Sequence, residues 1–305
     1  MDGLRLMEKQ NNIASLMLVA GCILFGLGSL IVKFVPVGAY AIAFWRLLIA
    51  SGIFYFLMKL GTTGPYIHAS ISSSYKYSLK SFKSISALSG VFLAFDLAFW
   101  HESIYAVGPG ISTLLNSLQI FCLAAIGFVF FAERQSKLQI LSLFLAVLGV
   151  ALISVEELQH NIDGIYGIVI GLISAVMLAG SMVMVKKVHQ EEQTALFPLM
   201  LIISLTGALV LLVPSLIFNS NNLYPTTWQD WGLVVIYGAV MQCVAWGMIA
   251  YSIPLLSLSV TGLLLLTEPV AALLIDYFYL DKAINLWQWL GALLTLFAIY
   301  LGSKR

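Results

Sequence analysis

The sequence predicts an all-α polytopic membrane protein in which ten transmembrane helices form two five-helix inverted repeats. Three observations support this fold class: an apolar composition, recurring apolar runs of similar length, and a second half that aligns with the first. Of the 305 residues, 61% are hydrophobic and 10% are charged, whereas a soluble domain carries about 25% charged residues. The mean hydropathy of +0.98 agrees with this contrast. The composition therefore excludes a soluble globular domain.

The apolar runs have the length that a membrane requires, because a bilayer core is crossed by about 20 mostly apolar residues in a helix. Charges, Pro, Gly and Asn bound these runs and give ten expected spans. They are residues 12–34, 38–58, 84–105, 108–131, 137–155, 163–185, 194–214, 229–251, 255–279 and 285–303. The seventh is the weakest, since Pro198 and Pro214 enclose it. The Ser/Lys-rich connection 60–83 could form a surface helix.

The distribution of positive charge predicts the orientation. With the N-terminus in the cytoplasm, the outer loops carry Lys282 alone, and the inner side carries twelve Lys and Arg residues. These are Arg5, Lys9, Lys59, Lys76, Lys80, Lys83, Arg134, Lys137, Lys186, Lys187, Lys304 and Arg305. By the positive-inside rule both termini are cytoplasmic. The absence of an Asn-x-Ser/Thr sequon is compatible with a bacterial cytoplasmic (inner) membrane.

An internal repeat appears when the chain is shifted by 149 residues. Gln139 then aligns with Gln288, and Gln119 aligns with Glu268. We expect a first repeat over 1–155 and a second over 156–305. Each contains five spans, an odd number, so the two copies insert with opposite orientations. Inverted repeats are a recurring architecture of secondary transporters, which bind substrate near the bilayer midplane where the repeats meet.

Several short motifs in their order resemble the drug/metabolite transporter superfamily, specifically its EamA-type ten-helix members. The second repeat has Pro269, an acidic turn at Asp281 and a Gln288-x-x-Gly291 helix. The first repeat has its acidic turn at Glu133, followed by Gln139. The first two spans, ILFGLGSLIVKF and YAIAFWRLLIAS, also resemble the family pattern. Ile120 in place of a proline and Lys282 in place of a glutamate depart from it.

This resemblance implies a secondary transporter that works by alternating access on a small polar metabolite. An amino acid or a related compound moved outward is the first expectation, and a nucleotide-type metabolite exchanger of the same superfamily is the alternative. No Walker motif is present, so ATP is not the direct driver. Proton coupling through an intramembrane acid, exchange and facilitated diffusion all remain open. The expected partners are a small-molecule substrate, the lipid bilayer and, if coupling uses them, protons. The protein could be a monomer or a homodimer.

Polar side chains inside the expected spans are candidates for the substrate pathway, since ionisable groups in a membrane are costly and usually functional. They are Arg46, Asp96, Trp100, Asn116, Gln119, Gln242, Trp246 and Glu268. Arg46 could instead extend to the interface or tie helices together. Asp96 could line the pocket, carry a proton or pair with Arg46. Pro269 is expected to bend its helix rather than contact substrate.

Spacing supports several of these assignments. Asn116 and Gln119 lie three residues apart on one helical face, and Gln242 and Trp246 lie four apart. Either pair could line the pathway or serve helix–helix packing through hydrogen bonds and contacts. We expect His101 and Glu102 to lie at the membrane interface, close to the outer surface.

Other function classes find little support in the sequence. His-Glu-x-x-His and Gly-x-Ser-x-Gly are absent, and the three cysteines show no ligand spacing, so no catalytic centre, metal site or cofactor is expected. A net charge of +1 gives no basic surface for nucleic acid. A channel or a non-transporting receptor is a weaker alternative, because channels usually show rings of charge or oligomeric pore symmetry.

Overall fold

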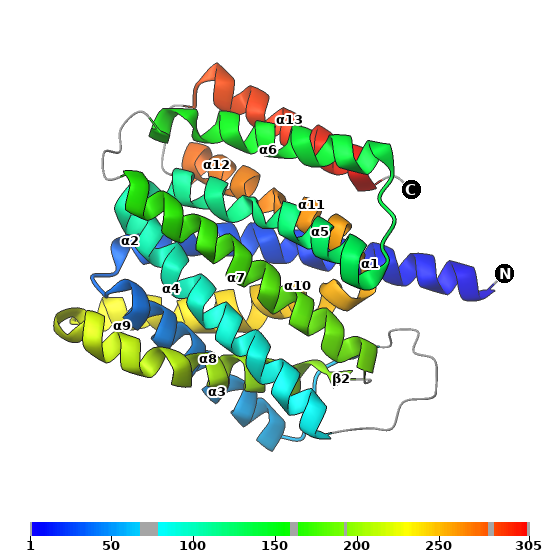
Figure 1. The fold of residues 1–305 in the computed structure, drawn as a ribbon. Helices are drawn as coiled ribbons and strands as arrows, with labels where there is room; N and C mark the ends of the chain where they lie inside the picture. Colours follow the sequence, from blue (N-terminus) through cyan, green and yellow to red (C-terminus); the bar gives the residue numbers. More distant parts are fainter. Residues whose placement is uncertain (1, 68–78, 159–163, 192–193, 280–283, 304–305) are drawn as a thin grey trace.

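Helices dominate the computed structural model, which describes residues 2–67, 79–158, 164–191, 194–279 and 284–303. Six of its helices are long and apolar enough to cross a membrane, and four shorter apolar helices accompany them. Within this described part the helices follow the ten expected spans and lie roughly along one common direction (Figure 1). The all-α polytopic fold class is confirmed.

The first half contributes five spans. The first is α1 (Asp2–Gly26) with α2 (Gly28–Phe34), the second is α3 (Ala39–Lys59), and the fifth is α6 (Lys137–Leu158). The third and fourth are α4 (Leu79–Ser117), which turns back on itself at Gly108, and α5 (Gln119–Phe131).

The second half contributes the other five. They are α7 (Gly164–Glu191), α8 (Leu196–Phe218), α9 (Trp228–Ile236) continued by a π-helical segment (Tyr237–Ala245) and α10 (Trp246–Ser252), α11 (Leu258–Leu265) continued by α12 (Thr267–Tyr279), and α13 (Leu286–Ser303). Short 3₁₀ turns occupy Ser220–Asn222 and Ile253–Leu255. A two-residue strand β1 (Tyr66–Ile67) pairs antiparallel with β2 (Thr194–Ala195).

One expectation needs correction, and the surface helix considered for residues 60–83 stays a prediction. Pro214 does not end the seventh span, because α8 continues through it to Phe218. A proline removes a single backbone donor, and a helix packed in a bundle tolerates that loss. The connection 60–83 forms strand β1 and the first turn of α4, and its residues 68–78 lie outside the described part of the chain.

Equivalent helices of the two halves begin with the same capping motif. In α6 the amide of Ser136 donates to Gln139 Oε1 (2.9 Å), and the amide of Gln139 donates to Ser136 Oγ (3.1 Å). In α13 Asn285 and Gln288 exchange the matching pair of bonds, at 3.0 and 2.9 Å. Each glutamine thus closes a capping box that satisfies backbone donors at the helix start. The two glutamines aligned by the 149-residue shift therefore have the same local role.

These two helices also pack against each other in opposite directions, as the alignment predicts for inverted copies. A Cβ added at Gly291 of α13 would lie only 2.5 Å from the carbonyl oxygen of Gly149 in α6. The Gln288 side chain donates to the carbonyl of Ile153 (3.4 Å). In Figure 1 the pair forms the uppermost layer of the bundle. Small residues at this crossing allow the two backbones to approach closely.

Large apolar side chains cover the outside of the bundle. Examples are Phe130 of α5, which is 77% exposed, and Leu209 of α8 and Leu293 of α13, which are each 62% exposed. Contiguous apolar surface of this kind does not remain open to water in a monomeric soluble protein. It is suited to lipid contact, while the polar groups of interest face inward.

We predict that Gly291→Ala lowers stability, because its new methyl group would collide with the α6 backbone. Overpacking of this kind costs about 1–3 kcal/mol, so thermal unfolding in detergent should begin several degrees lower. Gly52→Ala on α3 is the matched control, since nothing lies within 4 Å of a Cβ there. An unfolding temperature of Gly291→Ala equal to that of the control would contradict the close packing of α6 and α13.

Candidate functional site

A tight reversal inside α4 assembles the first part of the site. Gly108 has φ 82° and ψ 161°, a backbone conformation that residues with a Cβ rarely adopt. The chain after it runs back along the preceding helix, so that Ser112 Oγ donates to the carbonyl of Trp100 (3.2 Å). One turn further along, Asn116 Nδ2 donates to Asp96 Oδ1 (3.2 Å). The reversal thus brings two predicted pathway residues together.

The Asp96 carboxylate is buried, with 4% of the residue exposed, and it is hydrogen-bonded from two helices. Ser174 Oγ of α7 donates to it at 2.7 Å, beside the bond from Asn116. Asn116 also donates to Ser174 Oγ (2.9 Å). These bonds stabilise a carboxylate that the apolar surroundings would otherwise penalise. Arg46 does not bond to Asp96 directly, which removes the expectation that Asp96 is its structural partner.

Arg46 of α3 is fully buried and points into the bundle, so the alternative of an interfacial arginine is wrong. Its Nε donates to Gln242 Oε1 (2.9 Å), and one terminal nitrogen donates to the hydroxyl of Tyr237 (3.0 Å). Tyr237 and Gln242 lie five residues apart in the π-helical segment. A π-helix is wound more widely than an α-helix, with backbone hydrogen bonds between residues i and i+5, so residues five apart lie closer to one face than they do in an α-helix. This local geometry lets both side chains reach one guanidinium.

Aromatic rings surround the same guanidinium. Its central carbon lies 4.7 Å from the ring centre of Phe25 and 4.9 Å from that of Tyr237. Phe25 in turn packs against Trp100 and Trp246, with ring centres 6.1 and 6.3 Å apart. Contact with ring faces supplies cation–π attraction, which offsets part of the cost of burying the charge. Both predicted tryptophans therefore belong to the environment of Arg46.

Several buried polar atoms of the candidate pathway residues have no hydrogen-bond partner in the described part of the structure. They are the second terminal nitrogen of Arg46, Gln119 Oε1, Gln242 Nε2 and Trp246 Nε1. Buried polar groups are nearly always paired, and each exception calls for an explanation. Three of the four atoms are donors and one is an acceptor. A polar ligand or water between the helices would satisfy them.

Two helix breaks lie at equivalent places in the repeats. The ladder is interrupted at Leu266, between α11 and α12, and at Leu118, between the end of α4 and α5. Pro269 lies in the first turn after the Leu266 break. The Leu118 break has no proline beside it, because Ile120 occupies the corresponding position. Proline is therefore not required for this break, which the repeat architecture produces in both halves.

The two polar residues aligned by the 149-residue shift, Gln119 and Glu268, both lie directly after these breaks. Gln119 is the first residue of α5, and Glu268 is the second residue of α12. Glu268 is partly exposed inside the bundle, and its carboxylate interacts electrostatically with Asp96 and Arg46. Two acids and one arginine, contributed by α3, α4 and α12, are thus the ionisable side chains of the candidate pathway, and they are called the central cluster below. Among the described residues, no group of three His, Cys, Asp or Glu side chains is placed to hold a metal.

His101 is a residue of this hydrogen-bond network that sequence reasoning did not assign to the site. We expected it at the interface, yet none of its surface is exposed. Its Nδ1 lies 3.2 Å from the carbonyl of Ala39, and its Nε2 lies 2.8 Å from the Tyr237 hydroxyl. A ring with its proton on Nδ1 satisfies both groups, because the carbonyl only accepts and the hydroxyl then donates. A continuous chain of bonds therefore links Arg46, Tyr237, His101 and Ala39.

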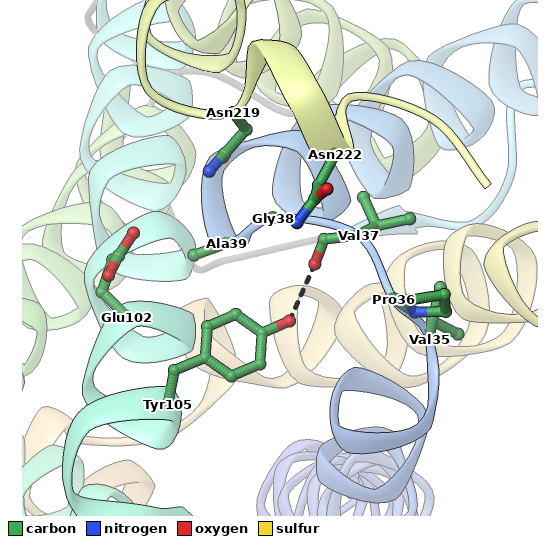
Figure 2. A pocket seen from close by; sticks show the side chains of 9 residues that line it. All are labelled: Val35, Pro36, Val37, Gly38, Ala39, Glu102, Tyr105, Asn219 and Asn222. Atoms are coloured by element: carbon green, nitrogen blue, oxygen red, sulfur yellow. Dashed lines mark hydrogen bonds between the residues drawn. The ribbon is translucent and has the colours of Figure 1, made fainter. Parts of the chain in front are cut away.

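A pocket of about 410 Å³ opens at the end of the bundle that contains the connection between α2 and α3 (Figure 2). Ala39 belongs to its wall, so the hydrogen-bond chain from Arg46 ends there. The opposite end of the bundle is the one where helix α1 starts and helix α13 stops (Figure 1).

A buried ion pair crosses that opposite end. Lys186 Nζ of α7 donates to Glu133 Oε1 at 2.7 Å, and the two side chains are only 11% and 14% exposed. Lys186 also donates to the carbonyl of Leu256 (2.8 Å). Both oxygens of Glu133 accept from the amide of Leu258, the first residue of α11, at 3.0 and 2.9 Å. One carboxylate of the first half thus ties together two elements of the second half.

We predict that Tyr237→Phe destabilises the fold, because it leaves His101 Nε2 and one arginine nitrogen buried without a partner. An unsatisfied buried polar group costs about 1–3 kcal/mol, which thermal unfolding in detergent will detect. Tyr224→Phe is the matched control, since Tyr224 is 60% exposed. Equal unfolding temperatures for the two variants would argue against the buried chain of bonds.

The comparisons with known proteins agree with this architecture. A model of the EamA-like transporter family matches residues 12–155 and again residues 165–303. No curated protein matches the chain at a significant level. One crystal structure, whose description names no activity, covers 95% of this chain and 97% of its own, with 13% identity and a TM-score of 0.73. That likeness shows a shared fold. The two family matches span nearly the whole chain, which therefore belongs to the EamA-like transporter family, within the drug/metabolite transporter superfamily of membrane transporters.

Proposed function

We propose that the chain is a secondary transporter that moves a small zwitterionic metabolite, an amino acid or a related compound, by alternating access. The observation that carries this proposal is a buried arginine with one unpaired nitrogen, in a bundle interior that also holds the acids Asp96 and Glu268. The guanidinium would bind the carboxylate of the substrate, since its planar donors match that group. Asp96 or Glu268 would receive the ammonium group.

The charge balance of the cluster also separates this substrate class from the alternative. A nucleotide carries several negative charges and is usually held by more than one cation or by a phosphate-binding loop. Here a single arginine faces two acids, so a polyphosphate would meet net repulsion. A small ligand that carries one positive and one negative charge matches one arginine and two acids better than a nucleotide does. Phe25, Trp100 and Trp246 would accommodate an apolar portion of that ligand.

Alternating access requires that one end of the pathway be closed while the other is open. The ion pair between Glu133 and Lys186 supports closure at the end where α1 starts, and the pocket beside Ala39 supports access from the other. We propose that residues 1–155 and 156–305 are the two units that rock against each other. The bonds of Glu133 to α7 and α11 would then break in each cycle.

We further propose export across a bacterial cytoplasmic membrane, with both termini in the cytoplasm. The distribution of Lys and Arg supports the orientation, and the family resemblance supports the direction. Asp96 and Glu268 are the groups that would carry a coupling proton. A monomer is sufficient for this mechanism, because all the proposed contacts lie within one chain.

In proteoliposomes we expect saturable uptake and counterflow of labelled amino acids and no flux of labelled nucleotides. Arg46→Lys should raise KM about tenfold or more, because a lysine cannot replace the forked donors and a charge-assisted bond contributes about 1.5–3 kcal/mol. Asp96→Asn and Glu268→Gln should lower flux, and the one that abolishes accumulation driven by a pH gradient would be the proton site.

Asp230→Asn is the control for that experiment, since Asp230 lies at the third position of α9, in the capping box with Thr227, and an asparagine side-chain oxygen can still accept from the Thr227 amide. Absence of saturable flux for every compound, with the protein folded and monodisperse, would refute the transporter proposal. An unchanged KM in Arg46→Lys would remove the arginine from the binding site.

Weakening the ion pair should open the end of the bundle that it closes. We expect Lys186→Met or Glu133→Gln to speed labelling of a cysteine introduced at Ser259 by an impermeant maleimide about tenfold or more. Removing one partner of a buried pair leaves the other uncompensated, at a cost of about 3–5 kcal/mol. Lys187→Met is the control, because its side chain is exposed. Labelling at the control rate in both variants would rule out a gating role.

A further inference from the structure

We propose that the pocket beside Ala39 is a second binding site, specific for an ammonium group, with Glu102 as its charged partner. Val35, Pro36, Val37, Gly38, Ala39, Glu102, Tyr105, Asn219 and Asn222 line the pocket (Figure 2). Its volume of about 410 Å³ is within the range of small-molecule sites. The proposal rests on the proposed function in one respect, that an amine is the natural occupant.

The hydrogen-bond donors of the pocket wall are largely used within the wall. The amide of Gly38 donates to the carbonyl of Asn222 (3.0 Å), and the amide of Val37 donates to that of Val35 (2.8 Å). The hydroxyl of Tyr105 donates to the carbonyl of Val37 (2.9 Å), the bond drawn in Figure 2. The side-chain amide of Asn222 is one further donor in the wall, so a ligand that needs several donors, such as a carboxylate or a phosphate, would be poorly satisfied.

The start of α3 would by itself attract an anion, because free amides and the helix dipole make such an end positive. Here the protein already occupies that position. Asn219 Oδ1 accepts from the amides of Tyr40 (2.9 Å) and Ala41 (3.2 Å). Its amide nitrogen donates to the carbonyl of Phe218 (3.1 Å). The anion-binding capacity of this helix end is therefore consumed inside the protein.

Acceptors remain available to a ligand. Glu102 is the charged side chain of the pocket wall, and it is half-buried, so its carboxylate is partly desolvated without being closed off. The lone pairs of Tyr105 add a neutral acceptor. A carboxylate in a half-buried pocket with few free donors favours a cation over an anion or a neutral molecule. Val35 and Pro36 supply apolar contact for the rest of a small amine.

The position of this pocket relates it to the central cluster. Its wall combines the first half of the chain, through α3 and α4, with the second half, through the loop that follows α8. The carbonyl of Ala39 is also the end of the hydrogen-bond chain that reaches Arg46 through His101 and Tyr237. An amine bound here would lie outside the central site, at the end of the bundle from which we propose access.

The test is direct binding of phenethylammonium to the full-length protein in detergent, by calorimetry at low salt. Its neutral and anionic analogues, 2-phenylethanol and 3-phenylpropionate, are the reference ligands. We expect the wild type to prefer the ammonium ligand to both by at least fivefold. Glu102→Gln should remove that preference with 2-phenylethanol affinity unchanged, and Glu102→Asp should retain part of it. Thermal unfolding of each variant confirms that it is folded.

Asp96→Asn and Glu268→Gln separate this site from the central one. Full ammonium binding in both of these variants, with its loss in Glu102→Gln, supports the outer site. Loss in either of them with retention in Glu102→Gln would overturn the proposal and place the ammonium group at the centre. A wild type without preference for the ammonium ligand would also overturn it. Because binding in detergent requires no flux, a protein that binds but does not transport would refute the proposed function alone.

Discussion

A guanidinium in the middle of an apolar bundle has to be hydrogen-bonded and flanked by aromatic rings, and this requirement organises much of the interior. Arg46 lies on α3, and its partners come from the π-helical segment and from α1. Because the arginine bonds groups 191 and 196 residues further along the sequence, it joins the two halves of the chain. The charge that is most costly to bury is thus also the one that fixes how the halves meet.

Asp96 shows a different way to offset the free-energy cost of burying a charge. Asp96 is satisfied by neutral hydroxyl and amide donors rather than by a cation, which leaves the arginine free to keep one unpaired nitrogen. A direct Arg46–Asp96 ion pair would have neutralised both groups and left little for a ligand. In the central cluster the opposite charges of Arg46 and Asp96 are hydrogen-bonded separately, each to its own partners. This arrangement suits a ligand that carries both a positive and a negative charge.

The spans, the repeat and most of the buried polar residues could be predicted, because apolar run length and a 149-residue alignment are properties of the sequence. Asn116 and Gln119 were found from helical spacing in the same way. His101 and Tyr237 were harder. Simple helical periodicity separates Tyr237 from Gln242, and only a π-helical segment brings them to one face. For His101, a position near the span end suggested only an interfacial role, and its burial against the start of α3 is a tertiary contact. Such contacts depend on tertiary structure that single-chain patterns do not encode.

The hairpin at Gly108 has a consequence for the order in which the protein is made. Asp96 meets Asn116 only 20 residues later, so this acid finds a first partner within its own hairpin as it enters the membrane. Arg46 has the ring of Phe25 nearby in the sequence, but its hydrogen-bond partners Tyr237 and Gln242 lie 191 and 196 residues downstream. At synthesis rates of about 5–20 residues per second, that interval is roughly 10–40 s. During it the arginine has to be accommodated by lipid headgroups, water or the insertion machinery. Biogenesis of the first half therefore depends on the second being completed promptly.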